Sequence, residues 1–246
     1  MDIQALETYL NNYLSVAEFT DYAPNGLQVE GRRTVQTVIT GVTACQALVD
    51  EAIARKADAI LVHHGYFWKN EPQTIVGMKR RRIASLLQHD INLLGYHLPL
   101  DAHPEVGNNA CLGTLWGLKD VTPQPGLLRL GKLPQPVSMD DWVLEVERSL
   151  QRPPLHLPGG PEQVETIAWC SGGAQGMIQQ AIDWGADVFI SGEVSEQTTH
   201  QAKESGIHYL AAGHHATETL GVKALGKHLA DKFGLDVTFV DIPNPV

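Results

Sequence analysis

The sequence predicts an α/β protein made of two related α/β/α halves that arose by internal duplication and carry mostly parallel sheets. Three observations predict this class. One segment of the chain repeats another without a gap, each copy has a strand–helix–strand pattern, and polar side chains follow the apolar runs. Strands that alternate with helices are typical of βαβ units, in which helices cover both faces of a parallel sheet. At 246 residues, the chain is long enough for two modest domains.

The repeat aligns residues 35–58 with residues 164–187. Without a gap, Gln46 falls on Gln175 and Asp58 falls on Asp187. In each copy an apolar run leads through a turn of small residues into a segment with a helical period. This likeness over a fixed offset indicates that one half is a copy of the other.

The first half begins with a predicted strand over residues 35–41, and a helix follows it. The helix has apolar residues at spacings of one, three and four, which form a stripe along one face: Leu48, Val49, Ala52 and Ile53. Further strands are expected over residues 59–62 and 91–96. An extra segment over residues 66–82 contains Tyr66, Phe67 and Trp68, and its aromatic side chains suit a flap near the polar residues that follow the strands.

The second half repeats this order from residue 164. Its helix carries the equivalent stripe: Met177, Ile178, Ala181 and Ile182. Strands are expected over residues 188–190 and 207–212. Segments 122–126 and 152–161 are rich in proline and glycine, and a short amphipathic helix is predicted between them over residues 139–150. We therefore predict domains over residues 1–125 and 126–246, with a C-terminal segment that is able to pack on the first domain.

Composition excludes several classes of protein. The formal net charge is −10, so nonspecific attraction to the phosphates of nucleic acid is not expected. No apolar run is long enough to span a membrane, and the acidic, amphipathic N-terminus differs from a secretory signal. The cysteines are odd in number and form no C-x-x-C pair: Cys45, Cys111 and Cys170. They are expected to be reduced, which favours the cytoplasm.

Histidines and carboxylates cluster directly after three of the predicted strands. His63 and His64 directly follow the apolar run 59–62. Two further segments place a histidine four residues before a carboxylate: His97 to Asp101 and His214 to Glu218. Imidazole and carboxylate are ligands of Zn²⁺, Mn²⁺ and Fe²⁺. In open α/β sheets, ligands gather outside the carboxyl ends of the strands. The clusters supply more ligands than one ion needs, so we predict two divalent metal ions per subunit.

The spacing suggests how the ligands are shared. Adjacent residues of a strand point to opposite faces, so His63 and His64 could share one ion only if the strand has already ended, and they are expected to serve two neighbouring ions. A helix that starts at His214 brings its imidazole and the Glu218 carboxylate to one face, where Glu218 is able to bridge both ions. Leu98-Pro99 argues against a regular helix from His97, and Asp101 is therefore expected to reach the metals from a loop.

Several residues near these clusters have less specific patterns. His97 is either a ligand or a support for one, and His97 and Glu193 are the candidate general acid/base residues. Segment 21–28 contains Asn25-Gly26, a turn signal. Loop 171–176 follows a strand and opens a helix, a geometry that can hold an anion. The cationic run 79–82 is either a solvated helix face or a phosphate-attracting rim above the metals.

The motifs together resemble the Nif-three-like family, also called GTP cyclohydrolase 1 type 2 homologs. They comprise His63-His64-Gly65, His97-x-x-x-Asp101, Gly192-Glu193, His214-His-Ala-Thr-Glu218 and Asn25-Gly-Leu-Gln28. The likeness runs through essentially the whole chain, including its end at residues 241–245. The resemblance implies two interlinked α/β domains, a dinuclear metal centre in the cleft between them, and a toroidal homohexamer. It places one metal on His64, Asp101 and Glu218, and the other on His63, His214 and Glu218.

Three functional hypotheses follow from these features and from the family resemblance. The leading hypothesis is a metal-dependent hydrolase that acts on a nucleotide or a related heterocycle, with aromatics of the flap stacking the base or simply packing in the core. The family label of GTP cyclohydrolase, and its suggested role in handling damaged nucleotides, agree with this hypothesis. The alternative is a non-catalytic metal chaperone or a ring-shaped scaffold, because an imidazole-rich site stores metal as readily as it uses it. A regulatory or DNA-repair partner rests on family association alone, and the acidic charge gives it no support.

Overall fold

The structure is a computed structural model that describes residues 1–246. It has a mixed α/β fold with two sheets, in two compact units. Unit 1 comprises residues 1–107 and 221–243, and unit 2 comprises residues 108–220 and 244–246. The chain therefore enters unit 2 well before residue 125, where the sequence suggested a boundary. The reason is that Leu112 and Trp116 already belong to an apolar core cluster of unit 2.

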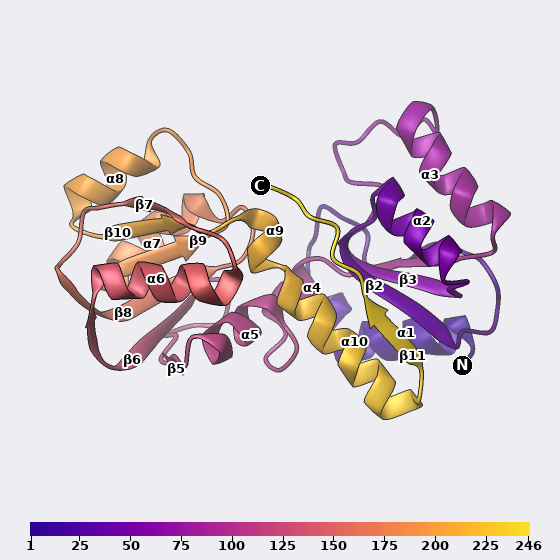
Figure 1. Ribbon diagram of the computed structural model, residues 1–246, viewed down its shortest axis with the longest axis horizontal. Helices are drawn as coiled ribbons and strands as arrows, with labels where there is room; N and C mark the ends of the chain where they lie inside the picture. The colour runs from indigo at the N-terminus through magenta and orange to yellow at the C-terminus, as the bar shows by residue number, and fades with distance from the viewer. The chain divides into compact units, whose positions relative to one another are not determined.

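Unit 1 is built on a five-stranded sheet with the strand order β1-β4-β3-β2-β11 (Figure 1). Its strands are β1 (Gly26–Val29), β2 (Thr37–Thr43), β3 (Ala59–His64), β4 (Asn92–Gly95) and β11 (Asp236–Phe239). The pairings β11–β2, β2–β3 and β3–β4 are parallel, and only the edge strand β1 runs antiparallel. The mostly parallel sheet expected from the sequence is present in this unit, and it brings the ends of β3 and β4 to the same edge.

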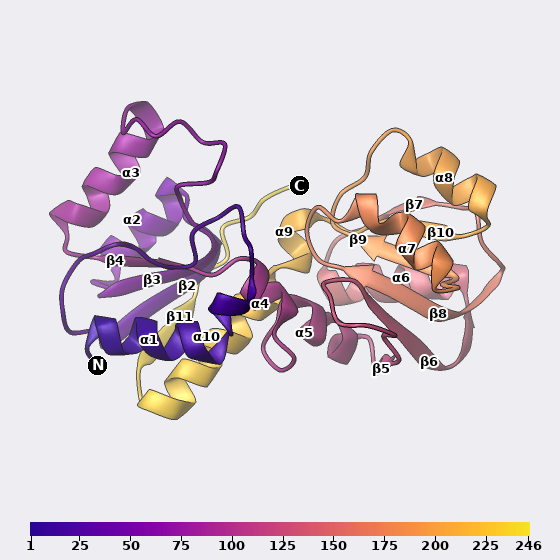
Figure 2. The ribbon, with the colours of Figure 1, turned by 180° about the vertical axis from the view of Figure 1, so that it is seen from behind.

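Helices cover both faces of this sheet. One face carries α1 (Ile3–Tyr13) and α10 (Thr219–Phe233), which Figure 2 shows next to each other, and the other face carries α2 (Gln46–Ala54) and α3 (Gly77–Gln88). A short α4 (Leu98–Ala102) follows β4, and a 3₁₀ turn, η1 (Val16–Glu18), follows α1. Helix α1 starts at Asp2, whose carboxylate accepts from the N–H groups of Gln4 and Ala5. Its apolar residues at spacings of three and four are fully buried against the sheet: Ile3, Leu6 and Leu10.

Unit 2 has a six-stranded sheet with the order β5-β6-β8-β9-β10-β7. Its strands are β5 (Lys119–Asp120), β6 (Arg129–Ser138), β7 (Leu155–Leu157), β8 (Gln163–Cys170), β9 (Val188–Ser191) and β10 (His208–Ala211). Strands β8, β9 and β10 are parallel, whereas the pairings β5–β6, β6–β8 and β10–β7 are antiparallel. The prediction of a mostly parallel sheet is therefore wrong for unit 2. Strand β6 contains prolines but tolerates them through a shift of register between Lys132 and Val137, and β7 lies within the segment 152–161 that looked like a linker.

The helices of unit 2 also form two layers around their sheet (Figure 1). On one face lie α5 (Asn108–Leu115) and α6 (Met139–Leu150), and on the other lie α7 (Ile178–Asp183) and α8 (Thr198–Ser205). Two further turns complete the unit: η2 (Gln175–Met177) and α9 (His214–Thr217). The helix predicted over residues 139–150 is confirmed, with the Ser138 side chain capping its first turn. None of the helices in the structure meets the length and hydropathy needed to cross a membrane.

The two aligned segments share a backbone-capping arrangement. The Asp58 carboxylate accepts hydrogen bonds from the N–H groups of residues 36 and 37, at 2.8 and 2.9 Å. The Asp187 carboxylate accepts them from residues 165 and 166, at 2.9 and 2.8 Å. These are the residues that the gap-free repeat pairs, so each strand–helix–strand segment closes with the same local contact.

Candidate metal centre

Unit 1 gathers three imidazoles at the carboxyl ends of β3 and β4. His63 and His64 are the last residues of β3, with ring centroids 4.6 Å apart, and His97 follows β4. One ring nitrogen of each of these histidines lies within 4.8 Å of those of the other two. His63 is buried, at 1% exposure, and His64 is half-buried. The strand ends at His64, so both imidazoles reach one cluster although they are adjacent in sequence. This group has the chemistry to hold a divalent metal ion.

The orientation of His63 is fixed by the backbone. Its Nδ1 lies 2.9 Å from the carbonyl oxygen of Tyr96. Because a carbonyl only accepts, Nδ1 donates, and the neutral ring then carries its lone pair on Nε2. This Nε2 lies 3.5 Å from Oδ2 of Asp101. The imidazole therefore presents its basic nitrogen to the side where a second candidate ligand stands.

Asp101 lies in the short helix α4, not in a loop as the sequence suggested. That expectation was wrong because Pro99 occupies the first turn of the helix, where a missing N–H costs no hydrogen bond. The helix turns the Asp101 carboxylate towards His63, and only 6% of the residue is exposed. A buried carboxylate beside imidazoles is a ligand set suited to Zn²⁺, Mn²⁺ or Fe²⁺.

His97 is held by Asp21, a residue whose functional role no sequence pattern indicated. Oδ1 of Asp21 lies 2.9 Å from Nδ1 of His97, and its Oδ2 accepts from the Leu98 N–H and the Asn25 amide. Burial raises the pKa of the Asp21 carboxyl, but hydrogen bonds from His97 and Asn25 outweigh burial and hold that pKa below its usual value. Asp21 is therefore an ionised acceptor that fixes the imidazole. The segment 21–28 is thus more than a turn, because its Asp21 and Asn25 side chains hold His97 in place.

In unit 2, His214 and Glu218 converge as expected from their spacing. His214 starts α9, and its Nε2 lies 3.2 Å from Oε1 of Glu218. Glu218 is 2% exposed, whereas His214 is half-buried. A buried carboxylate and an imidazole at this distance are able to bind the same cation.

Glu193 orients His214 from the other side of the ring. Its Oε1 lies 2.7 Å from Nδ1 of His214, so Nδ1 donates to the carboxylate and Nε2 faces Glu218. Burial lowers the pKa of His214, but hydrogen bonds to Glu218 and Glu193 and their charges outweigh it and raise the pKa to about 9. Glu193 was expected to serve as a general acid/base. The structure places its carboxylate against the imidazole of His214. A residue that orients a metal ligand in this way, through a hydrogen bond, is called an outer partner.

The loop before α7 packs closely against these ligands. Gly172 has a φ of +65°, and a Cβ built there would lie 2.2 Å from Oε1 of Glu218. Three of the loop's N–H groups are used within unit 2: Ser171 donates to Asn109, Gly172 to Thr217, and Ala174 to Ser191. The hypothesis that loop 171–176 binds an anion gains no support from this geometry, because those donors are engaged.

Two aromatic rings surround the imidazole of His97. Tyr22 and Trp68 approach it edge-on, with centroids 5.0 and 5.1 Å away. Tyr66, by contrast, is buried in the core of unit 1, so it does not face a ligand. Lys79, at the start of the cationic run, donates to the Pro72 carbonyl within the flap. Among the flap residues Tyr66, Phe67 and Trp68, Trp68 is thus the one whose ring lies beside the imidazole of His97.

Removing the negative charge of Glu193 is expected to weaken metal binding. In Glu193→Gln, the neutral amide oxygen stabilises the Nδ1–H of His214 less than the carboxylate does, which makes the ring a poorer ligand, and we expect a loss of about 10- to 100-fold in affinity. Competition with a chromophoric chelator measures it. The matched control is Glu196→Gln, because Glu196 is exposed and its carboxylate lies beside His200 at the surface. Equal affinity in both variants would contradict the outer-partner role.

Comparison with known proteins places the chain in a family. The family model described as Duf34/NIF3 (NGG1p interacting factor 3) matches residues 1–245. A protein of Yersinia pestis named "GTP cyclohydrolase 1 type 2 homolog" is 58% identical over 241 residues, which cover 98% of each chain. A protein of the same name from Escherichia coli K12 is 54% identical, with the same coverage.

Solved structures with high sequence identity have the same fold. The structure of a bacterial protein described as "protein ybgI, unknown function" matches with a TM-score of 0.97 and 54% identity over 100% of both chains. The motifs of this chain also resemble those of ybgI. TTHA1606 from Thermus thermophilus matches with a TM-score of 0.92 and 39% identity over 100% of both chains. As its histidine and carboxylate motifs predicted, the chain belongs to the Duf34/NIF3 family, and it is similar over nearly its whole length to proteins named GTP cyclohydrolase 1 type 2 homolog.

Proposed function

We propose that the protein is a metal-dependent hydrolase that acts on a nucleotide or a related heterocycle. Its proposed centre holds two divalent ions on five ligands: His63, His64, Asp101, His214 and Glu218. The observation that carries the proposal is the fixed orientation of imidazoles in both units. His63 and His214 each have Nδ1 occupied by an acceptor, which directs Nε2 towards a buried carboxylate. Outer partners of this kind are typical of metal-ligating histidines.

The number of donors favours a centre that uses both units. Unit 2 contributes one imidazole and one carboxylate, His214 and Glu218, which is fewer than the ligands a divalent ion takes from protein in most sites. Unit 1 contributes the imidazoles of His63 and His64 and the carboxylate of Asp101. We therefore propose that neither set is complete alone and that Glu218 bridges the two ions. The names of the relatives are consistent with a hydrolytic reaction on a purine nucleotide.

The chemistry divides between the ions and the chain's own residues. When bound, two such ions lower the pKa of a bound water towards about 7 and polarise the substrate oxygen. Glu193 holds the ring of His214, and the Tyr96 carbonyl holds the ring of His63. His97 is the better candidate for moving a proton, because Asp21 orients its Nδ1 and leaves Nε2 for a substrate. The Trp68 ring beside His97 limits the access of water.

We also propose that the two units derive from one ancestral strand–helix–strand unit. The equivalent caps at Asp58 and Asp187 support this origin, since they join aligned residues in both copies. Duplication would explain why each unit carries ligands after a parallel strand. The toroidal homohexamer and the cytoplasmic location stay predictions from the resemblance and the composition, and light scattering of the purified protein tests the hexamer.

A turnover screen tests the hydrolase. Purified protein loaded with Mn²⁺ or Zn²⁺ is expected to hydrolyse at least one member of a panel of nucleotides and phosphoesters. Asp101→Ala is expected to abolish that turnover while its circular dichroism spectrum remains that of the wild type. If the panel shows no metal-dependent turnover, the hydrolase proposal fails. Rapid transfer of metal to an acceptor protein would then favour the metal chaperone.

A further inference from the structure

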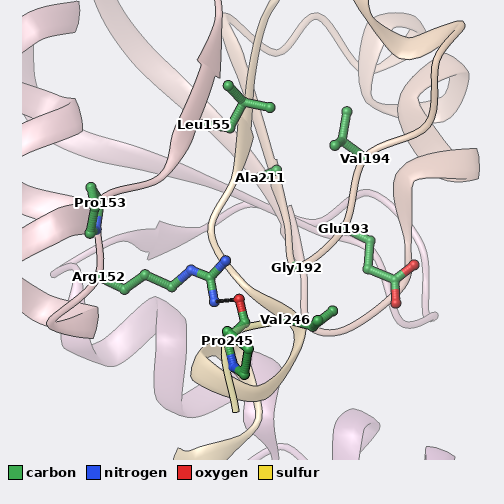
Figure 3. Close-up of a pocket in the computed structure, with 9 residues that line it drawn as sticks. All are labelled: Arg152, Pro153, Leu155, Gly192, Glu193, Val194, Ala211, Pro245 and Val246. Atoms are coloured by element: carbon green, nitrogen blue, oxygen red, sulfur yellow. Dashed lines mark hydrogen bonds between the residues drawn. The ribbon is translucent and has the colours of Figure 1, made fainter. Parts of the chain in front are cut away.

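Unit 2 contains a pocket of about 520 Å³ that adjoins the proposed ligands (Figure 3). Glu193, the partner of His214, is one of its lining residues. Most of the wall is apolar and comes from separate segments of the unit: Pro153, Leu155, Val194, Ala211 and Val246. Pockets of about 300–1,000 Å³ with an apolar lining and few polar groups are typical of small-molecule sites.

The positive charge in this pocket comes from Arg152. Figure 3 shows its side chain extending into the pocket, where the guanidinium donates a hydrogen bond to the Pro245 carbonyl. The guanidinium also packs on Gly213, since a Cβ built on this glycine would lie 2.9 Å from Nε of Arg152. The guanidinium of Arg152 is therefore held next to the backbone of Gly213, which directly precedes the proposed metal ligand His214.

Arg152 differs from the other arginines of unit 2 in its charge environment. Arg129 pairs with Asp120, and Arg148 pairs with Glu145, whereas Arg152 has no carboxylate partner. Its one side-chain hydrogen bond, to a neutral carbonyl, leaves further N–H donors of the guanidinium for another acceptor. A planar guanidinium binds phosphate and carboxylate through paired hydrogen bonds.

We infer that Arg152 binds an anionic group, a phosphate or a carboxylate, of a small molecule whose apolar or planar part lies against Leu155 and Val194. This inference rests on the proposed function, because it makes the pocket the substrate-recognition part of the same site. The anion would bind at Arg152, and the reacting part of the molecule would lie towards Glu193 and His214. Arg152 thus selects charged substrates over their uncharged analogues.

Equilibrium binding tests the inference with defined probes. Calorimetry with metal-loaded protein compares GMP with guanosine, and orotate with uracil, so that each pair differs by a phosphate or a carboxylate. We expect the charged member of one pair to bind more tightly, and the pair that responds identifies the anion. Arg152→Gln is expected to weaken that binding about 10- to 100-fold, the range for a hydrogen bond to a charged group. Arg148→Gln, which removes the same charge from an exposed position, should change it less than about 2-fold.

A second variant keeps the test decisive if Arg152→Gln fails to fold. Val194→Trp leaves Arg152 intact and fills the pocket from a side chain that is 37% exposed, so it should also abolish binding of the charged probe. The inference is overturned if neither GMP nor orotate binds the wild type, or if folded Arg152→Gln binds as Arg148→Gln does.

Failure of the inference can be told apart from failure of the hydrolase. If binding depends on Arg152 but no substrate is turned over, the inference about Arg152 stands and the hydrolase proposal fails. If a substrate is turned over with a KM that Arg152→Gln leaves unchanged, the hydrolase proposal stands and the inference about Arg152 fails. If both hold, Arg152→Gln raises KM for the charged substrate and leaves kcat largely intact, because the guanidinium binds away from the reacting atoms.

Discussion

Asp101→Asn is expected to reduce the metal content of the protein from the proposed two divalent ions per chain to one or none. The substitution keeps the size of a side chain that is buried beside His63 but removes the negative charge that offsets a cation. Outer partners alone affect metal affinity by about 10- to 100-fold, so losing a directly bound carboxylate should cost more. Elemental analysis of protein dialysed against trace Zn²⁺ or Mn²⁺ measures the loss.

Asp90→Asn is the matched control for this experiment. Asp90 lies in the same unit, and its side chain is exposed at the end of the α3–β4 connection. This variant should retain both ions and the thermal stability of the wild type. An Asp101→Asn protein that keeps the metal content of Asp90→Asn would remove Asp101 from the proposed ligand set.

Gly172→Ala is expected to disrupt metal binding although it replaces none of the proposed ligand residues. The new methyl group would lie 2.2 Å from Oε1 of Glu218 and 3.1 Å from Nε2 of His214, so the carboxylate must move. The backbone at Gly172 has a φ of +65°, where a residue other than glycine adds about 1–2 kcal/mol of strain. We therefore expect at least about a 10-fold loss of affinity, similar to the loss of an outer partner, and a lower Tm in metal-free protein.

Gly176→Ala separates the steric effect from a general effect on this loop. Gly176 is four residues away, and a Cβ built there meets no atom within 4 Å. Its Tm and metal affinity should match the wild type. If Gly172→Ala binds metal as tightly as Gly176→Ala, then Glu218 is not held in a ligand position by this loop.

The parallel strand–helix–strand segments could be predicted because their signals are local. Within each of the segments 35–62 and 164–190 the apolar runs and the helical stripe follow one another closely in the chain, and the structure forms β2–α2–β3 and β8–α7–β9 there. The antiparallel strands of unit 2 could not be predicted in this way. Strand β6 contains Pro134 and Pro136, and β7 is a three-residue edge strand among prolines, so local propensity argued for loops.

The candidate site shows the same division between local and distant signals. The pairs His63–His64 and His214–Glu218 stand out because spacing and strand ends place them. The contact between Asp21 and His97 joins residues 76 positions apart, which no local pattern reveals. Asp101 was placed in a loop because Pro99 was taken as a helix breaker rather than as a first-turn residue. Arg152 carried no signal, since its importance comes from the pocket that the fold builds around it.

Anomalous diffraction from crystals of the wild-type protein grown with Zn²⁺ or Mn²⁺ tests the central claim most directly. We expect two anomalous peaks per chain, about 3.5–4 Å apart, with His63, His64 and Asp101 of unit 1 and His214 and Glu218 of unit 2 as their ligands. Peaks confined to the side chains of one unit, or no peak at any of these five residues, would contradict the proposal of a shared dinuclear centre.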